Sequence, residues 1–183
     1  MPKKSDKLRT MDKKQGYIQI YTGDGKGKTT AALGLALRAS GAGLRVFIAQ
    51  FVKGMTYSEL FSIKKLPGVK LQQFGRDCFI HKEPDKKDIE AAKKGFEKVK
   101  KILKSGNYDI VILDEANIAL YYNLFTEDEL IEAINNRFAG VEVIVTGRKA
   151  PQKLIDMADL VTEMKEIKHY YTKGVEARKG IEN

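Results

Sequence analysis

YTGDGKGKTT, residues 21–30, places three glycines and two lysines between an alternating apolar run and a segment rich in Ala and Leu. Glycine lets a backbone adopt positive φ and approach an anion closely. Successive N–H groups of such a turn form an anion-binding concavity, and the positive end of the following helix dipole supports it. We therefore expect a phosphate-binding turn between a strand and a helix.

The segment TGDGKGKT, residues 22–29, fits the Walker A pattern G-x-x-x-x-G-K-[ST], with Thr22 in place of the first glycine. In this pattern Lys28 bridges phosphate oxygens and the Thr29 hydroxyl coordinates Mg²⁺. Asp24 is unexpected, because a carboxylate repels a bound phosphate; it either points outward or binds a ribose hydroxyl or the backbone. The predicted nucleotide-binding residues of this stretch are Thr22, Gly23, Asp24, Gly25, Lys26, Gly27, Lys28, Thr29 and Thr30.

Strand-like and helix-like segments alternate along the rest of the chain. Continuous apolar runs of strand length are typical of strands buried on both faces of a parallel sheet. The expected strands are 16–22, 44–51, 69–75, 108–115, 141–147 and 159–167. The expected helices are 29–41, 58–66, a long amphipathic helix opening near Asp85, 126–136 and 150–158. This alternation predicts an α/β domain with a mostly parallel central sheet flanked by helices.

Polar residues follow three of these strands, where ligands of parallel sheets bind. Asp114 and Glu115 end VILDE, which reads as a Walker B strand whose carboxylates serve Mg²⁺ and, in hydrolytic enzymes, water activation. Arg148, in VTGRKAP, follows another strand and would reach the bound anion. The alternatives are a strand end capped by acids and an ordinary surface arginine.

Length and composition favour one globular domain in a reducing compartment. We expect a flexible basic arm over residues 1–16 and a single domain over 17–183. No apolar run approaches the ~18–20 residues that cross a bilayer, and the charged N-terminus lacks a signal-peptide core. The lone Cys78 excludes an intrachain disulfide framework and fits the cytoplasm. The net charge of +9 suggests an anionic partner, but the sequence does not show the pattern of aromatic residues interleaved with a basic patch, which disfavours single-stranded nucleic acid.

Several motifs together resemble the P-loop type of corrinoid adenosyltransferase, which acts on cobalamin or a biosynthetic precursor. They are YTGDGKGKTTAA, QFVKG, VILDE, TGRKAP and the tail ADLVTEMKEIKHYYTKGVEARKGIE, and the likeness spans about residues 16–182. The resemblance implies a RecA-like P-loop fold, a homodimer, and ATP with Mg²⁺ as reactants beside a corrinoid. It implies transfer of the 5′-deoxyadenosyl group to cobalt(I), release of triphosphate and a flavoprotein reductant. It also implies that ATP lies reversed in the loop, and that a modified first position such as Thr22 is normal.

The resemblance also assigns roles at the site. Glu115 and Thr29 would be the metal ligands, with Asp114 behind them, and no general base would be required. Positive charge would neutralise the leaving triphosphate, supplied by Lys26, Lys28 and Arg148. The catalytic residues implied are Lys28, Arg148 and Phe79.

A second implication concerns the cobalt face from which the axial ligand is removed. The matching stretch is GRDCFIHKEP, in which Phe79 would block that face. His81 stands where relatives carry a tryptophan, so either it turns away or a neighbour such as Tyr57 or Phe74 helps. For His169 in the tail, a loop-anchoring hydrogen bond is favoured over a ligand role.

Two other classes fit parts of the sequence. A RecA-like ATPase or nucleic-acid-binding P-loop module is permitted by the loop, the Asp-Glu pair and the basic charge, although no accessory domain is evident. A P-loop kinase would need an arginine-rich lid, whereas Arg137, Arg148 and Arg178 are scattered.

Overall fold

A computed structural model describes residues 15–75 and 83–182. The predicted arm over 1–16 therefore lies almost wholly outside the described residues, and Phe79 and His81 lie wholly outside them. The expected α/β architecture is confirmed for the described chain, which forms alternating strands and helices around one sheet.

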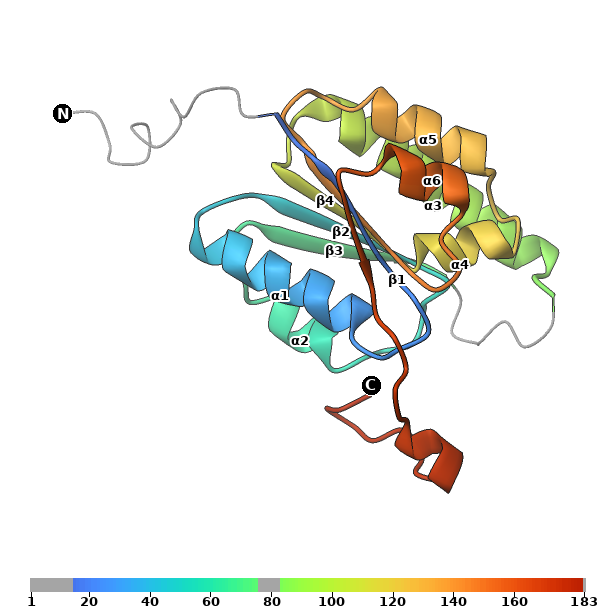
Figure 1. Cartoon of the computed structure of the whole chain (residues 1–183). Helices are drawn as coiled ribbons and strands as arrows, with labels where there is room; N and C mark the ends of the chain where they lie inside the picture. Colours follow the sequence, from blue (N-terminus) through green and yellow to red (C-terminus); the bar gives the residue numbers. More distant parts are fainter. Residues whose placement is uncertain (1–14, 76–82, 183) are drawn as a thin grey trace.

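The sheet has six strands, and every pair of neighbours is parallel. Its order is β3-β2-β4-β5-β1-β6 (Figure 1). The strands are β1 (Ile18–Thr22), β2 (Val46–Phe51), β3 (Val69–Phe74), β4 (Ile110–Asp114), β5 (Glu142–Thr146) and β6 (Leu160–Glu163). Because all six run the same way, the ends of β1, β4 and β5 meet at one edge, as the sequence predicts.

Helices cover both faces of the sheet. They are α1 (Lys28–Gly41), α2 (Glu59–Ile63), α3 (Lys86–Ser105), α4 (Ala116–Tyr121), α5 (Glu127–Asn135) and α6 (Gln152–Met157), followed by a 3₁₀ turn, η1 (Tyr170–Lys173). Figure 1 shows α1 and α2 on one face and the other four α-helices on the opposite face. Alternate strand residues point to opposite faces, so the strands feed two separate apolar clusters, one under each helical layer.

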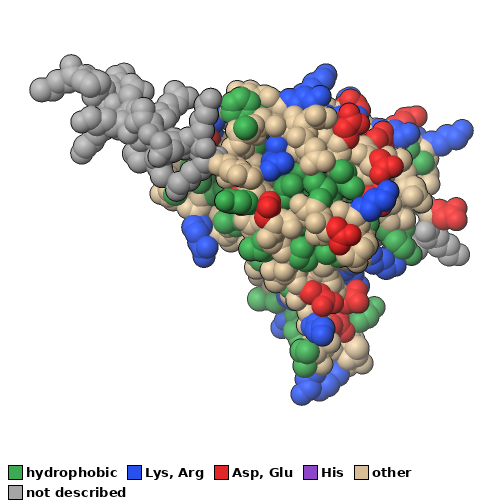
Figure 2. All heavy atoms as spheres, turned by 45° about the horizontal axis from the view of Figure 1, so that its top comes forward, with side chains coloured by type: hydrophobic (Ala, Val, Ile, Leu, Met, Phe, Trp, Pro, Cys, Tyr) green, Lys and Arg blue, Asp and Glu red, His purple; other side chains and the backbone are tan. Residues whose placement is uncertain are grey.

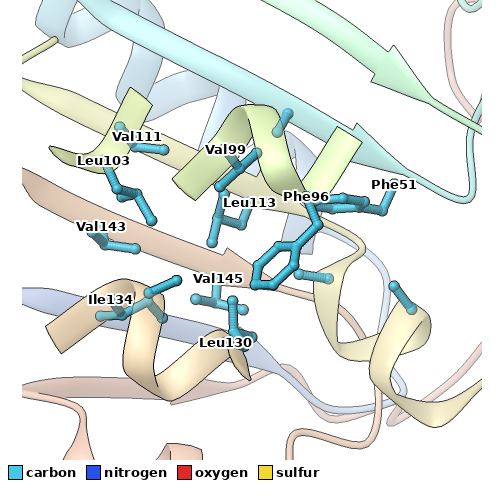
Figure 3. Close-up of a cluster of buried hydrophobic side chains, with 14 of the residues drawn as sticks. Phe51, Phe96, Val99, Leu103, Val111, Leu113, Leu130, Ile134, Val143 and Val145 are labelled. Carbon is cyan, nitrogen blue, oxygen red and sulfur yellow. The ribbon is translucent and has the colours of Figure 1, made fainter. Parts of the chain in front are cut away.

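The larger cluster lies between the sheet and α3–α5 (Figure 3). The predicted amphipathic character of α3 is confirmed: Phe96, Val99 and Leu103 are buried, and lysines occupy the exposed face. The ring of Phe96 stacks on that of Phe125 with centroids 4.4 Å apart. The helix begins after a capping box, in which the Asp85 carboxylate accepts from the backbone N–H of the third helical residue.

Two elements differ from the sequence prediction. Helix α4 follows β4 directly and was not predicted, because its N-cap, Glu115, is not a preferred capping residue and enters the helix with φ of 57°. The last strand was expected over 159–167 but ends at Glu163. Beyond it Met164 turns across the phosphate loop, so the sequence that follows no longer pairs with β1.

The surface carries charges of both signs. Figure 2 shows Lys and Arg interspersed with Asp and Glu over one face, rather than gathered in one basic stripe. Among the described residues, the structure contains no helix that is both long and apolar enough to span a membrane.

Candidate functional site

The phosphate loop, residues 23–27, connects β1 to α1 at the carboxyl edge of the sheet. Gly23 and Gly27 adopt the predicted positive φ, 92° and 118°. The same expectation for Gly25 is wrong, because its φ lies outside that region. Gly25 instead donates its N–H to the carbonyl oxygen of Met164 at 2.6 Å, and a Cβ at this position would come within 2.7 Å of that oxygen. Close backbone contact therefore accounts for this glycine.

Lys28 begins α1 and folds back over the loop. Its buried ammonium donates to the carbonyl oxygens of Gly23 at 2.7 Å and Gly25 at 2.6 Å. Burial, with the nearby positive charge of Arg148, lowers the pKa of Lys28. The loop thus holds a desolvated cation beside its own backbone, where a phosphate oxygen can replace the carbonyls as its partner.

Asp114, the last residue of β4, is buried and fully hydrogen-bonded. Its Oδ1 accepts from the hydroxyls of Thr29 (2.8 Å) and Thr146 (2.7 Å). Its Oδ2 accepts from the Gln50 amide (3.1 Å) and the Lys53 ammonium (2.9 Å). The carboxylate therefore ties together α1, the ends of β2 and β5 and the residues just after β2.

Glu115 differs sharply from its neighbour. Its backbone N–H donates to the Thr146 hydroxyl at 3.0 Å, and its carboxylate accepts no hydrogen bond from the described residues. Burial and the charge of Asp114 raise the pKa of Glu115. The Glu115 carboxylate and the Thr29 hydroxyl both offer oxygen donors, the kind that Mg²⁺ prefers. No cluster of three or more His, Cys, Asp or Glu exists in the described chain, so phosphate oxygens would have to complete such a site.

Lys53 is the site residue that sequence reasoning missed. Its ammonium lies 2.9 Å from Asp114 and 3.2 Å from the Thr29 hydroxyl, and its side chain is only 16% exposed. Two signals were available: its place in the motif QFVKG, and its position two residues after a buried strand at the same sheet edge as the phosphate loop.

Comparison with known proteins identifies the family of the chain. The family model described as ATP:corrinoid adenosyltransferase BtuR/CobO/CobP matches residues 14–183. The chain belongs to this family. Corrinoid adenosyltransferase from Escherichia coli K12 is 33% identical over 92% of this chain and 86% of its own length. Corrinoid adenosyltransferase CobA from Salmonella typhimurium LT2 is 34% identical over the same shares.

Other comparisons extend the family likeness and place the fold. The Pseudomonas aeruginosa corrinoid adenosyltransferase is 33% identical over 97% of this chain and 88% of its own. A crystal structure of the RadB recombinase superposes with a TM-score of 0.50 over 91% of this chain and 82% of that one. Its sequence identity is 17%, so this likeness concerns the RecA-like P-loop fold alone.

The remaining predicted nucleotide-binding residues of this family member lie around the loop mouth. Asp24 is exposed and points outward, with Oδ1 3.9 Å from Nε of the exposed Arg148. Thr30 is also exposed. The buried Thr22 hydroxyl accepts from the backbone N–H of Ala150 at 3.3 Å, so the residue that replaces the first glycine anchors the chain after β5.

The C-terminal tail of this adenosyltransferase family member closes over Lys26. The Lys26 ammonium donates to the Glu182 carboxylate at 2.8 Å and to the carbonyl oxygen of Ile181 at 2.9 Å. Glu182 also accepts from the Tyr170 hydroxyl and from Arg178, and these hydrogen bonds, led by that of Lys26, hold its pKa well below its usual range. Lys26, predicted as a phosphate ligand, is therefore paired with the tail.

The aromatic candidates separate into two groups. Phe74 is buried against Phe51, with ring centroids 5.8 Å apart, so it belongs to the core. Tyr57 is on the site side, its ring centroid 5.7 Å from the Lys53 ammonium. His169 Nδ1 accepts from the Tyr171 N–H at 3.1 Å, the loop-anchoring bond favoured from the sequence.

Proposed function

We propose that the protein transfers the 5′-deoxyadenosyl group of ATP to the cobalt(I) centre of a corrinoid and releases triphosphate. The observation that carries the proposal is the family match over residues 14–183, which includes the phosphate loop, the Asp114–Glu115 pair and the closing tail. A likeness confined to the loop would support any P-loop enzyme.

The proposed reaction is a nucleophilic substitution at carbon. The cobalt(I) electron pair forms a bond to C5′ of the ribose, the C5′–O5′ bond breaks, and its electron pair leaves on the triphosphate. No proton moves, so no general base is needed. The protein's main task is to stabilise a departing polyanion by fixed positive charge. Lys28, already desolvated beside the loop, and the exposed Arg148 suit that task, and Lys26 would join them if the tail opened.

Mg²⁺ would be held by the Thr29 hydroxyl and the Glu115 carboxylate together with phosphate oxygens. When bound, the ion would neutralise part of the triphosphate charge. Asp114 accepts a hydrogen bond from the Thr29 hydroxyl, which turns a lone pair of that hydroxyl oxygen away from the carboxylate. We further propose the reversed ATP orientation implied by the family likeness, which would present C5′ to the corrinoid.

Several parts of the proposal lie beyond the described site. Phe79 would pack on the vacated cobalt face, a flavoprotein would supply electrons, and the enzyme would work in the cytoplasm. A homodimer is supported by the edge strand β6, on which every residue is exposed, including Leu160 and Val161. Sedimentation analysis of the full chain tests the dimer, and a purely monomeric protein would contradict it.

The decisive experiment supplies ATP, Mg²⁺ and chemically reduced cob(I)alamin to the purified protein. The expected result is the absorption spectrum of a cobalt–carbon bond, with one triphosphate released per adenosyl group transferred. ADP as the product, without alkylated corrinoid, would indicate a kinase or ATPase. ATP hydrolysis stimulated by DNA or RNA would revive the nucleic-acid alternative.

A further inference from the structure

We propose that Lys53 is a positioning residue of the metal–phosphate site. Because its ammonium pairs with the Asp114 carboxylate, a divalent ion binds at this site only together with nucleotide. This inference rests on the proposed function in one respect, that Mg²⁺ and ATP are the ligands of the site. It adds a role for a residue that neither the Walker patterns nor the predicted site contains.

The backbone around Lys53 is built to hold it in one place. Val52, directly before it, has φ of 57°, a left-handed conformation that is a genuine outlier for a β-branched residue. Such strain persists only where the surroundings over-determine the structure, and it concentrates at functional sites. On the other side, Gly75 lies so close that a Cβ added there would come within 2.4 Å of the backbone nitrogen of Lys53. Strand ends β2 and β3 thus clamp this residue.

The Lys53 ammonium bonds to the two groups that a P-loop site offers on the metal side. It donates to Asp114 Oδ2 at 2.9 Å and to Thr29 Oγ1 at 3.2 Å. With Gln50 and Thr146, these contacts give each Asp114 oxygen two donors. Asp114 is therefore saturated, and Glu115 is left as the carboxylate with free oxygens.

The charge balance then depends on nucleotide. Without ATP, a divalent ion near Thr29 would meet the fixed positive charge of Lys53, and the Asp114 charge is already paired. With ATP, the phosphates bring enough negative charge to hold both cations. Lys53 would in this way make metal binding depend on nucleotide binding, and it would keep Glu115 rather than Asp114 as the protein's carboxylate ligand.

Mn²⁺ binding followed by electron paramagnetic resonance tests this without any cobalt chemistry. In wild type we expect strong Mn²⁺ binding only when ATP is present. Lys53→Met frees the Asp114 charge beside Glu115, so nucleotide-free Mn²⁺ binding should tighten about tenfold or more. Lys53→Gln should do the same while keeping a hydrogen-bond donor for Asp114. This variant therefore tests the proposal even if Lys53→Met does not fold. Lys53→Arg should behave like wild type.

The matched controls separate this role from a structural one. Lys153→Met removes a lysine that also pairs with an aspartate, Asp128, at 3.2 Å, but on the surface, and it should leave Mn²⁺ binding unchanged. Adding Asp114→Asn to Lys53→Gln should abolish the gain. Unchanged nucleotide-free Mn²⁺ binding in folded Lys53→Gln, or a gain that survives Asp114→Asn, overturns the proposal. Normal Mn²⁺ behaviour with no adenosyl transfer would instead count against the proposed function alone.

Discussion

Gly25 illustrates how a residue of the phosphate loop is determined by a contact far along the chain. There is no room for a side chain at this position, because the backbone atoms of Met164 and Lys165 pass directly beside it. Lys28 illustrates the complementary case, since its ammonium is held by carbonyls of the loop itself. The first residue shapes the loop, and the second supplies its charge.

Gly25→Ala is expected to destabilise the protein by about 1–3 kcal/mol, because the new Cβ displaces the segment after β6. Thermal or urea unfolding measures the change. Gly34→Ala is the control, because this exposed position in α1 has no atom within 4 Å of the added Cβ. The control should stabilise the protein by about 1 kcal/mol. Equal effects of the two substitutions would contradict the close approach of Met164.

Lys28→Met is expected to lower kcat for adenosyl transfer about 10²–10³-fold, because a preorganised cation facing the leaving group is removed. Steady-state kinetics with varied ATP measures kcat and KM separately. Lys98→Met, on the exposed face of α3, should leave both constants unchanged. A Lys28 variant with wild-type kcat would show that the ammonium does not touch the triphosphate.

At the level of the element, α3 combines a strong sequence signal with a specific packing partner. The sequence predicts that it opens near Asp85 and that one apolar face is buried, and the structure adds the capping box at its start. The stack of Phe96 on Phe125 joins α3 to the segment that follows α4. Helix α4 itself was not predicted from the sequence.

Phe96→Ala is expected to cost about 3–5 kcal/mol of unfolding free energy, because it leaves a cavity between α3 and the sheet. Denaturant unfolding measures the loss. Lys93→Ala, one turn earlier on the exposed face of α3, should change stability by less than about 0.5 kcal/mol. A small loss for Phe96→Ala would mean that the core collapses to fill the space.

For the whole molecule, the partly buried Glu115 charge opposes folding while it serves the site. Burial raises the pKa of Glu115 above its ordinary value of 4.5, so the folded protein binds that proton more tightly than the unfolded chain does. The resulting stabilisation is complete below the unfolded pKa and is lost as pH rises through the raised folded pKa. Stability and metal binding therefore respond to pH in opposite directions across this window.

Glu115→Gln is expected to remove that loss and so to raise the free energy of unfolding at neutral pH. Mg²⁺-dependent activity should fall in the same variant, because the ionised carboxylate is gone. Thermal unfolding as a function of pH measures the first effect and Mg²⁺ titration of activity the second. Glu97→Gln, at an exposed carboxylate of α3, should alter neither, and a Glu115 variant less stable than wild type at neutral pH would contradict the argument.

Much of this protein can be worked out from short stretches of its chain. The loop pattern of residues 22–29, the alternation of apolar strands with amphipathic helices, and the capping residues are local signals, since each depends on neighbours within about one or two turns. The meeting of Asp114, Thr146 and the phosphate loop at one edge also follows, because parallel strands align their carboxyl ends. The family motifs add the expected chemistry.

Contacts between distant residues required the folded chain. Lys53 lies 61 residues from Asp114, and Lys26 lies 156 residues from Glu182, so no periodicity or motif pairs them. The loop sequence YTGDGKGKTT by itself therefore predicts a phosphate site. Side-chain packing in three dimensions places Lys28 against the loop, pairs Lys26 with the tail and pairs Lys53 with Asp114. Burial and charge pairing depend on this packing.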